Sequence, residues 1–323
     1  MTLRDKASLM RTLRWFLPLL LLAACTRTLP VQVAADVDDS LARALLDEFA
    51  AHQHAVLDRT RADDAEVVWT NDPEPVLRRA AAGELAPLSE ATVGARTPPL
   101  ADPQRRWAAA AAIGRVIVYD PARLSDDASP THVLDLARPE LARQLVLAAP
   151  TRGAALWHAA ALCARLGESD GLGFFRALRA GGARVVADED AVVAALTAGE
   201  QPLALIDSDR AYAAQAALPR LVITIPDQGD GGSGVFVLPS VVALTPRGAA
   251  NARATALAEF LLAAPQAFRI ALTSNAFVVA ADGKAPPSLL NVGQLKLMPV
   301  VYADLVGRLA AVRAALAAMP DRV

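Results

Sequence analysis

The sequence predicts an α/β protein built as two lobes, in which mostly parallel sheets are flanked by helices and two crossover strands form a hinge. Short apolar runs of strand length alternate with segments whose apolar residues recur at helical spacing, which is typical of sheets covered on both faces. The chain has 323 residues, more than one ordinary domain needs, and 54% of them are hydrophobic, enough for a sizeable core.

Eight short, largely apolar runs predict the buried strands. They are 31–35, 66–69, 115–119, 145–148, 184–187, 203–206, 221–225 and 235–238. The runs 115–119 and 221–225 stand where a chain would pass from the first lobe to the second and back. We therefore expect these two runs to be the crossover strands.

Helices are expected between these strands, wherever apolar residues recur every three or four positions. They are 41–52, 75–83, 154–166, 171–180, 191–198, 252–263 and 300–319. Asp38, Asp39 and Ser40 offer caps for the first of them. The segment 89–104 is rich in proline and polar residues, which predicts a loop. His158 lies inside an apolar helical pattern and is expected in the core.

The first 24 residues resemble a lipoprotein signal peptide. The basic residues at its start are Arg4, Lys6, Arg11 and Arg14. The apolar run 15–24 that follows is shorter than the roughly 20 residues of a membrane span. It ends in Leu-Ala-Ala-Cys, which resembles a lipobox, so Cys25 is the expected lipidation site and 25–30 a tether. An ordinary signal peptide containing a cysteine is the alternative. Because Thr26 follows rather than aspartate, the outer membrane is favoured over the inner.

Composition excludes several classes of function. A formal net charge of −2 without a long like-charge block argues against a nucleic-acid partner. Two cysteines and 4 histidines argue against a disulfide framework and a structural zinc site. Cys163, in an apolar stretch, is expected to be a buried, inert thiol. Since we find no cofactor loop and no nucleophile–base set, we expect no enzyme activity and no required cofactor.

A series of short motifs follows the predicted strands in order. They are VVWTND at 67–72, GELAPL at 83–88, GRVIVYD at 114–120, APTRG at 149–153, LIDSD at 205–209, PDQ at 226–228 and VFVLPSVVAL at 235–244. Together they resemble the ferric-binding and related solute-binding proteins of ABC importers, a branch of the type II periplasmic binding fold. The resemblance covers about 31–308.

This resemblance implies a monomeric periplasmic protein that delivers a small-molecule or ion ligand to ABC permease and ATPase subunits. It also implies two discontinuous lobes with a ligand cleft between them. The first lobe would comprise 31–116 and 226–284, and the second 117–225 and 285–323. Membrane attachment would occur only through the lipid anchor.

Most candidate ligand residues follow the predicted strands, because ligands in open α/β sheets lie beyond the carboxyl ends of strands. The resemblance adds Arg115 on a crossover strand, and Arg210 and Tyr212 at or near the positions of the family's ligands. The full set is Thr70, Asn71, Asp72, Arg115, Thr151, Arg152, Asp207, Ser208, Asp209, Arg210, Tyr212 and Ser240. Arg115 and the helix start at 151–153 could hold an oxyanion. Asp207 and Asp209 could hold a cation or a cationic solute, and Asp72 and Asp209 are the candidate metal ligands.

Each of these assignments has a structural alternative. Asp72 is equally suited to a turn or to capping the next helix, and Asp207 and Asp209 to capping the helix over 210–216. Arg115 could instead be a surface arginine on the hinge strand.

The motifs also depart from the family pattern. Iron-binding members use two consecutive tyrosines, and Asp209 and Arg210 stand at the corresponding positions, with Tyr212 two residues later. The expected ligand is an iron-, oxyanion- or phosphonate-like solute, and a bound metal ion or metal–anion complex is one form that it could take. The alternative function is a degenerate binding fold that acts as a scaffold or sensor lipoprotein without transport.

Overall fold

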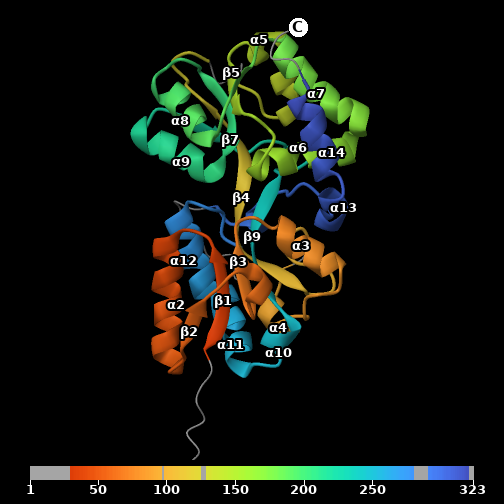
Figure 1. The fold of residues 1–323 in the computed structure, drawn as a ribbon. Helices are drawn as coiled ribbons and strands as arrows, with labels where there is room; N and C mark the ends of the chain where they lie inside the picture. The colour runs from red at the N-terminus through yellow and green to blue at the C-terminus, as the bar shows by residue number, and fades with distance from the viewer. Residues whose placement is uncertain (1–29, 97, 125–128, 280–289, 320–323) are drawn as a thin grey trace, which may run out of the picture. The chain divides into compact units, whose positions relative to one another are not determined.

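The computed structural model describes residues 30–96, 98–124, 129–279 and 290–319. The predicted signal peptide and the lipidation site Cys25 lie outside these ranges. The strands are β1 (Val31–Asp36), β2 (Leu57–Arg59), β3 (Val67–Thr70), β4 (Trp107–Tyr119), β5 (Leu145–Ala148), β6 (Arg184–Val186), β7 (Leu203–Asp207), β8 (Val222–Thr224) and β9 (Val237–Leu244). In the described part of the chain they form one sheet in the order β2-β1-β3-β9-β4-β7-β5-β6, with β8 paired to β4 (Figure 1).

Strand β4 joins two portions of this sheet. Its residues 107–114 pair with β9, whereas its residues 115–119 pair with β7. We name the portion with β1, β2, β3, β9 and the start of β4 lobe 1, and the portion with β5 to β8 and the end of β4 lobe 2. Within lobe 1, β1 runs parallel to β2 and β3, and within lobe 2, β5 runs parallel to β6 and β7. The predicted two-lobed α/β fold is confirmed, with antiparallel pairs where β4 or β9 takes part.

The crossover strands differ in position from the prediction. β4 begins at Trp107, eight residues before the predicted start, because the alanines 108–112 continue the strand and are fully or almost fully buried. Alanine has a weak strand preference, and here tertiary packing overrides it. The run 221–225 forms only the short β8, which pairs with the end of β4 in lobe 2. The chain therefore returns to lobe 1 between β8 and β9, and β9 pairs with β3 and β4.

The α-helices are α2 (Asp39–Gln53), α3 (Glu74–Ala81), α4 (Glu90–Val93), α5 (Pro139–Ala142), α6 (Gly153–Leu166), α7 (Glu168–Ala180), α8 (Glu189–Thr197), α9 (Ser208–Ala217), α10 (Pro246–Ala249), α11 (Ala252–Leu262), α12 (Ala264–Ser274), α13 (Tyr302–Val306) and α14 (Leu309–Ala317). Short 3₁₀ helices are η1 (Ala62–Asp64), η3 (Val133–Ala137) and η4 (Val292–Gln294). Two predictions were wrong in detail. The loop 89–104 contains α4, because the Ser89 side chain caps its first turn. The helix 300–319 is broken into α13 and α14 around Gly307.

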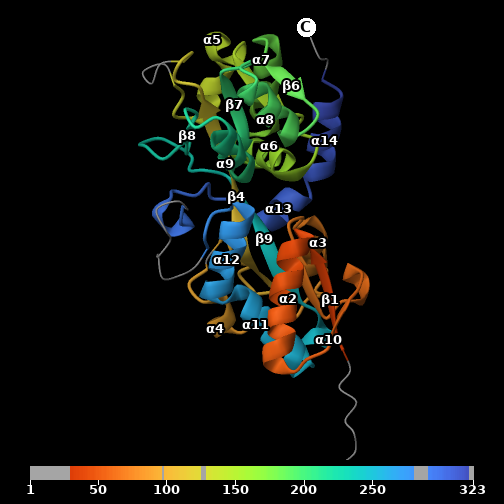
Figure 2. The same cartoon turned by 90° about the vertical axis from the view of Figure 1, so that its left-hand side faces the viewer.

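Helices cover both faces of the sheet. One hydrophobic cluster includes Leu45 of α2, Leu257 of α11 and Ala195 of α8, and the other includes Leu77 of α3 and Leu156 of α6. Figures 1 and 2 show α2 and α12 side by side on the first of these faces. Because the central strands are buried from both sides, their sequences are continuously apolar rather than alternating.

The predicted burial of Cys163 is confirmed. The residue lies in α6 as a free thiol, and burial raises its pKa. Helix α7 approaches so closely that a Cβ on Gly171 would lie 2.5 Å from the Cα of Cys163. A protonated thiol enclosed in this way is a weak nucleophile.

No single helix in the described ranges is long and apolar enough to cross a membrane. The pair α11 and α12, which are bent by 59° at their junction, meets that criterion only when both are counted together.

Candidate ligand cleft

Two adjoining cavities lie at the carboxyl ends of the lobe 2 strands. The acidic cavity, of about 370 Å³, is lined by Ala148, Ala149, Arg152, Gly153, Ala154, Ala155, Ala187, Asp188, Glu189, Asp190, Asp207, Asp209 and Arg210. The interlobe cavity, of about 230 Å³, is lined by Asn71, Ala111, Ala112, Ile113, Gly153, Ala154, Asp207, Asp209, Leu238, Ser240, Ile270, Ser274 and Ala276. The two cavities share Gly153, Ala154, Asp207 and Asp209. The interlobe cavity also includes Asn71, which follows β3, and Ser240 of β9, so it is lined by residues of both lobes.

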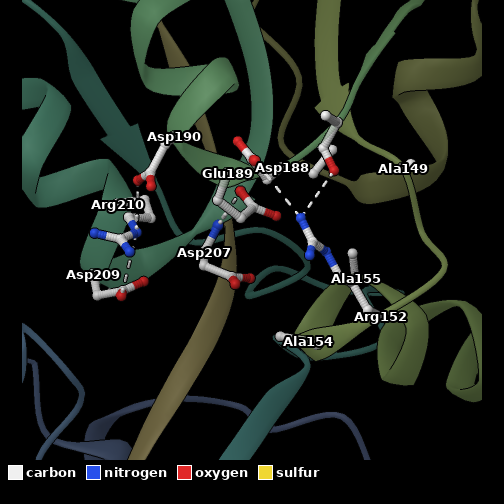
Figure 3. Close-up of a pocket in the computed structure, with 13 residues that line it drawn as sticks. Ala149, Arg152, Ala154, Ala155, Asp188, Glu189, Asp190, Asp207, Asp209 and Arg210 are labelled. Atoms are coloured by element: carbon white, nitrogen blue, oxygen red, sulfur yellow. Dashed lines mark hydrogen bonds and ion pairs between the residues drawn. The ribbon is translucent and has the colours of Figure 1, made fainter. Parts of the chain in front are cut away.

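The parallel strands of lobe 2 explain why these side chains converge. β5, β6 and β7 are neighbours that run in one direction, so their carboxyl ends meet at one edge of the sheet. Each is followed by a helix, α6, α8 or α9, whose first turn begins at that edge. Figure 3 shows Arg152 on one side, Arg210 with Asp190 on the other, and Glu189 and Asp207 between them.

Arg115 binds two of the carboxylates that line the acidic cavity. It lies opposite Asp207 in the β4–β7 register, and its side chain is only 1% exposed. Nη1 donates to Glu189 Oε1 at 2.5 Å and to Asp207 Oδ1 at 2.6 Å, and Nη2 donates to the Leu205 carbonyl at 3.0 Å. Burial alone would lower the pKa of Arg115, but the two carboxylates outweigh burial and raise it. Arg115 is therefore a permanently charged support for this edge.

Glu189 completes the same network. Its Oε2 accepts a hydrogen bond from the backbone N–H of Asp207 at 3.3 Å. Burial raises the pKa of Glu189, and the charge of Arg115 opposes that rise. The first residue of α8 is thus tied to the end of β7, which fixes the relative position of two walls of the acidic cavity.

Asp209 has a different environment, because it lines both cavities and its side chain, which is 29% exposed, forms no short ion pair with a described residue. Its Oδ1 is buried and accepts no hydrogen bond from any described residue. Its Oδ2 lies 3.9 Å from Nε of Arg210, beyond hydrogen-bond distance, while the same Nε lies 3.3 Å from Oδ1 of Asp190. Burial, and then the charge of Asp207, raise the pKa of Asp209 to about 6.

Negative charge predominates in this region. Five carboxylates line the acidic cavity, against the guanidinium groups of Arg152 and Arg210. Each of these arginines has an acidic partner on the rim, since Arg152 lies 3.6 Å from Asp188 and Arg210 lies 3.3 Å from Asp190. When Arg115 is also included, two negative charges remain in excess. The cleft therefore attracts positive charge.

Part of the predicted site is brought together here. Arg152, Asp207, Asp209 and Arg210 line the acidic cavity. Asn71 and Ser240 line the interlobe cavity, opposite the carboxylates of lobe 2. The strand-end rule therefore identified residues from both lobes that face a common space.

The other predicted residues have structural contacts. Ser208 is buried, and its Oγ accepts a hydrogen bond from the Gly114 N–H at 3.0 Å. Asp72 Oδ1 accepts from the Glu74 N–H at 3.1 Å, which is the turn role named as one of its alternatives. Thr70 Oγ1 bonds to the backbone of Asp72.

Three further predicted residues are not part of the lining of either cavity. Thr151 and Tyr212 line neither cavity, and Thr151 presents its carbonyl to Nε of Arg313 at 3.0 Å. Arg115 is neither exposed nor cavity-lining. For the metal prediction, the described residues contain no group of three or more His, Cys, Asp or Glu side chains placed to hold a metal ion.

Sequence reasoning missed the acidic run Asp188, Glu189 and Asp190. These residues come one residue after strand β6, and Asp188 caps α8 by accepting from the Ala191 N–H at 3.0 Å. The same strand-end rule that identified Asp207 and Asp209 would have identified them, had it been applied to every predicted strand.

Comparison with known proteins agrees with this architecture. The sequence profile of the bacterial extracellular solute-binding protein family matches residues 86–292. Iron-bound HitA from Pseudomonas aeruginosa is similar in fold, with a TM-score of 0.76 and 20% identity over 89% of this chain and 99% of that chain. Apo FutA2 from Synechocystis has a TM-score of 0.74 and 21% identity over 89% and 98%.

A third similar structure is the Trichodesmium protein IdiA (FutA) in complex with iron and citrate, with a TM-score of 0.75 and 19% identity over 89% of this chain and 98% of that chain. At these identities the structures establish the fold. The family profile covers well over half of the sequence. The chain belongs to the bacterial extracellular solute-binding protein family.

Proposed function

We propose that this chain is the solute-capturing component of a bacterial ABC importer, anchored in the periplasm by a lipid on Cys25. It would deliver its ligand to permease and ATPase subunits as a monomer. The observation that supports this proposal is the interlobe cavity, where Asn71 and Ser240 of lobe 1 face Asp207 and Asp209 of lobe 2. A solute in this cavity would contact both lobes at once, which favours closure about a hinge in β4.

The lobes that close would be residues 31–116 with 226–284, and residues 117–225 with 285–323. The change of pairing partner along β4, from β9 to β7, supports a hinge near Gly114.

The charge of the cleft bears on the class of solute. HitA was solved with iron, and the Trichodesmium protein with iron and citrate. In this chain Asp209 and Arg210 occupy the positions that resemble the tyrosine pair of iron-binding members. The excess of carboxylates disfavours a free oxyanion or phosphonate and supports a ligand, organic or metal-containing, that carries positive charge.

Solute capture is tested by native mass spectrometry of the chain purified from a bacterial periplasm without denaturation. We expect a species heavier than the bare chain by the mass of one small solute. Unfolding and refolding the protein should remove the bound solute and lower the melting temperature. Adding the small-molecule fraction of the periplasm should then restore the added mass and the higher melting temperature, because a ligand that binds only the folded state stabilises it by mass action. A bare mass, together with no stabilisation by that fraction, would contradict capture and favour a scaffold or sensor role.

The anchor is tested separately by replacing Cys25 with alanine. The full chain is expected to incorporate labelled palmitate and to sediment with outer membranes, whereas Cys25→Ala should lose the label and become extractable without detergent. Cys163→Ala is the matched control, since it removes the other cysteine of the chain and should keep both label and membrane association. Unchanged labelling of Cys25→Ala would contradict the lipid anchor.

A further inference from the structure

We propose that the captured solute is a small organic cation, with an ammonium or guanidinium head group at Asp209 and an apolar body along the lobe 1 wall of the interlobe cavity. This inference rests on the proposed solute capture and specifies the chemistry of the ligand. It follows from one unsatisfied carboxylate oxygen, from the surrounding charge, and from the unequal distribution of polar and apolar lining.

The unsatisfied oxygen is Oδ1 of Asp209. It is buried, yet no described residue donates a hydrogen bond to it. A buried acceptor without a donor is costly, whereas the rest of the Asp209 side chain, which is 29% exposed, remains accessible. Since Asp209 lines both cavities and its side chain is 29% exposed, a ligand in either cavity can pair with the accessible part of this carboxylate.

The excess of carboxylates around Asp209 favours a ligand group that carries positive charge. Glu189 and Asp207 share the single guanidinium of Arg115, and Arg210 is closer to Asp190 than to Asp209. A neutral donor would satisfy the oxygen but leave the negative excess in place. An ammonium or guanidinium group supplies both the hydrogen bond and the countercharge.

The rest of the interlobe cavity indicates an organic body. Ala111, Ala112, Ile113, Leu238, Ile270 and Ala276 form most of its other wall. These six apolar side chains offer no oxygen ligands, and the polar residues beside them are Asn71, Ser240 and Ser274. A hard metal ion takes six or more oxygen ligands or keeps its waters. The apolar side chains do match a hydrocarbon chain or a small ring, because apolar surface is stabilised when it leaves water. A molecule with one charged end and one apolar end fits both walls.

The test uses amines and alcohols with the same carbon skeleton. Isothermal titration calorimetry of the full mature chain would compare pentylamine with pentan-1-ol and with pentanoate, and benzylamine with benzyl alcohol. We expect at least one cation to bind and to exceed its neutral or anionic counterpart at least tenfold in affinity. Asp209→Asn should weaken that binding by roughly ten- to hundredfold, since it keeps the shape and removes the charge.

The matched control is Asp170→Asn, another aspartate in the first turn of a helix, α7, which is exposed and lines neither cavity. It should leave the affinity unchanged. A melting temperature of Asp209→Asn no lower than that of the unsubstituted chain would show that lost binding does not reflect unfolding.

Two outcomes would overturn the inference, and they differ in whether they also contradict the proposed function. If ferric citrate or methylphosphonate binds and no cation exceeds its counterpart, the organic cation is excluded while solute capture remains. If none of these probes binds and the periplasmic fraction also fails to stabilise the chain, the inference and the proposed function are both lost.

Discussion

Replacing Arg115 with methionine is expected to lower the free energy of unfolding by about 3–5 kcal/mol. The guanidinium is 1% exposed and donates to Glu189 at 2.5 Å and to Asp207 at 2.6 Å. Methionine fills similar space but leaves two carboxylates, each only 17% exposed, without their counterion. Removing one partner of a buried ion pair is more damaging than the pair itself is stabilising. Urea unfolding at neutral pH, monitored by circular dichroism, measures the loss.

Two further variants separate the buried charge from the general effect of losing an arginine. Arg138→Met removes an exposed arginine that lies 3.7 Å from Glu140, and it should cost less than about 1 kcal/mol. Combining Arg115→Met with Glu189→Gln and Asp207→Asn should recover much of the stability, because neither partner of Arg115 is then a carboxylate. A cost for Arg115→Met no larger than that for Arg138→Met would contradict the network.

The fold could be predicted from sequence because it rests on local patterns. The runs 145–148 and 203–206 are apolar and of strand length, and in the structure they are buried as β5 and most of β7. The run 108–112 could not be assigned in the same way. Five alanines carry no strand preference, and only the helices packed on both faces of β4 explain why they are extended.

The candidate site was predictable as a location but not as a set of contacts. The strand-end rule led to Asp207 and Asp209, because the direction of a parallel strand follows from its order in the chain. Whether Arg115 faces a ligand or a carboxylate depends on its register opposite Asp207 and on Glu189, 74 residues away in sequence. No local pattern contains that information. In the structure Arg115 supports the carboxylates of Glu189 and Asp207, and it is not the ligand contact that was predicted.

Burial in the core also determines the protonation state of His158. This residue of α6 is 1% exposed, as its apolar neighbours predicted, and its ring stacks on Phe236 with centroids 5.4 Å apart. Its Nε2 is buried with no hydrogen-bond partner among the described residues. Burial, and then the charge of Arg115, lower the pKa of His158 to about 3. The folded protein therefore keeps His158 neutral well below neutral pH.

This neutral state makes the fold sensitive to acid. Between about pH 6.5 and about pH 3 the unfolded chain binds a proton at His158 and the folded chain does not, so stability falls as the pH falls through that window. His158→Phe keeps a ring against Phe236 and cannot be protonated. We compare the free energy of unfolding of the variant with that of the unsubstituted chain at each pH. The difference in favour of the variant should be about 3 kcal/mol larger at about pH 4 than at about pH 7.5.

The measurement is a pair of urea unfolding curves for each protein, one at each pH. Only the change in the difference between proteins is interpreted, because any packing cost of the phenyl ring is the same at both pH values. His158→Gln cannot be protonated either, so it should show the same change with a different constant offset. Trp157→Phe, at the neighbouring buried position, alters packing without removing a titrating group and should shift stability equally at both pH values. A constant difference for His158→Phe would mean that the folded protein protonates His158 as readily as the unfolded chain does.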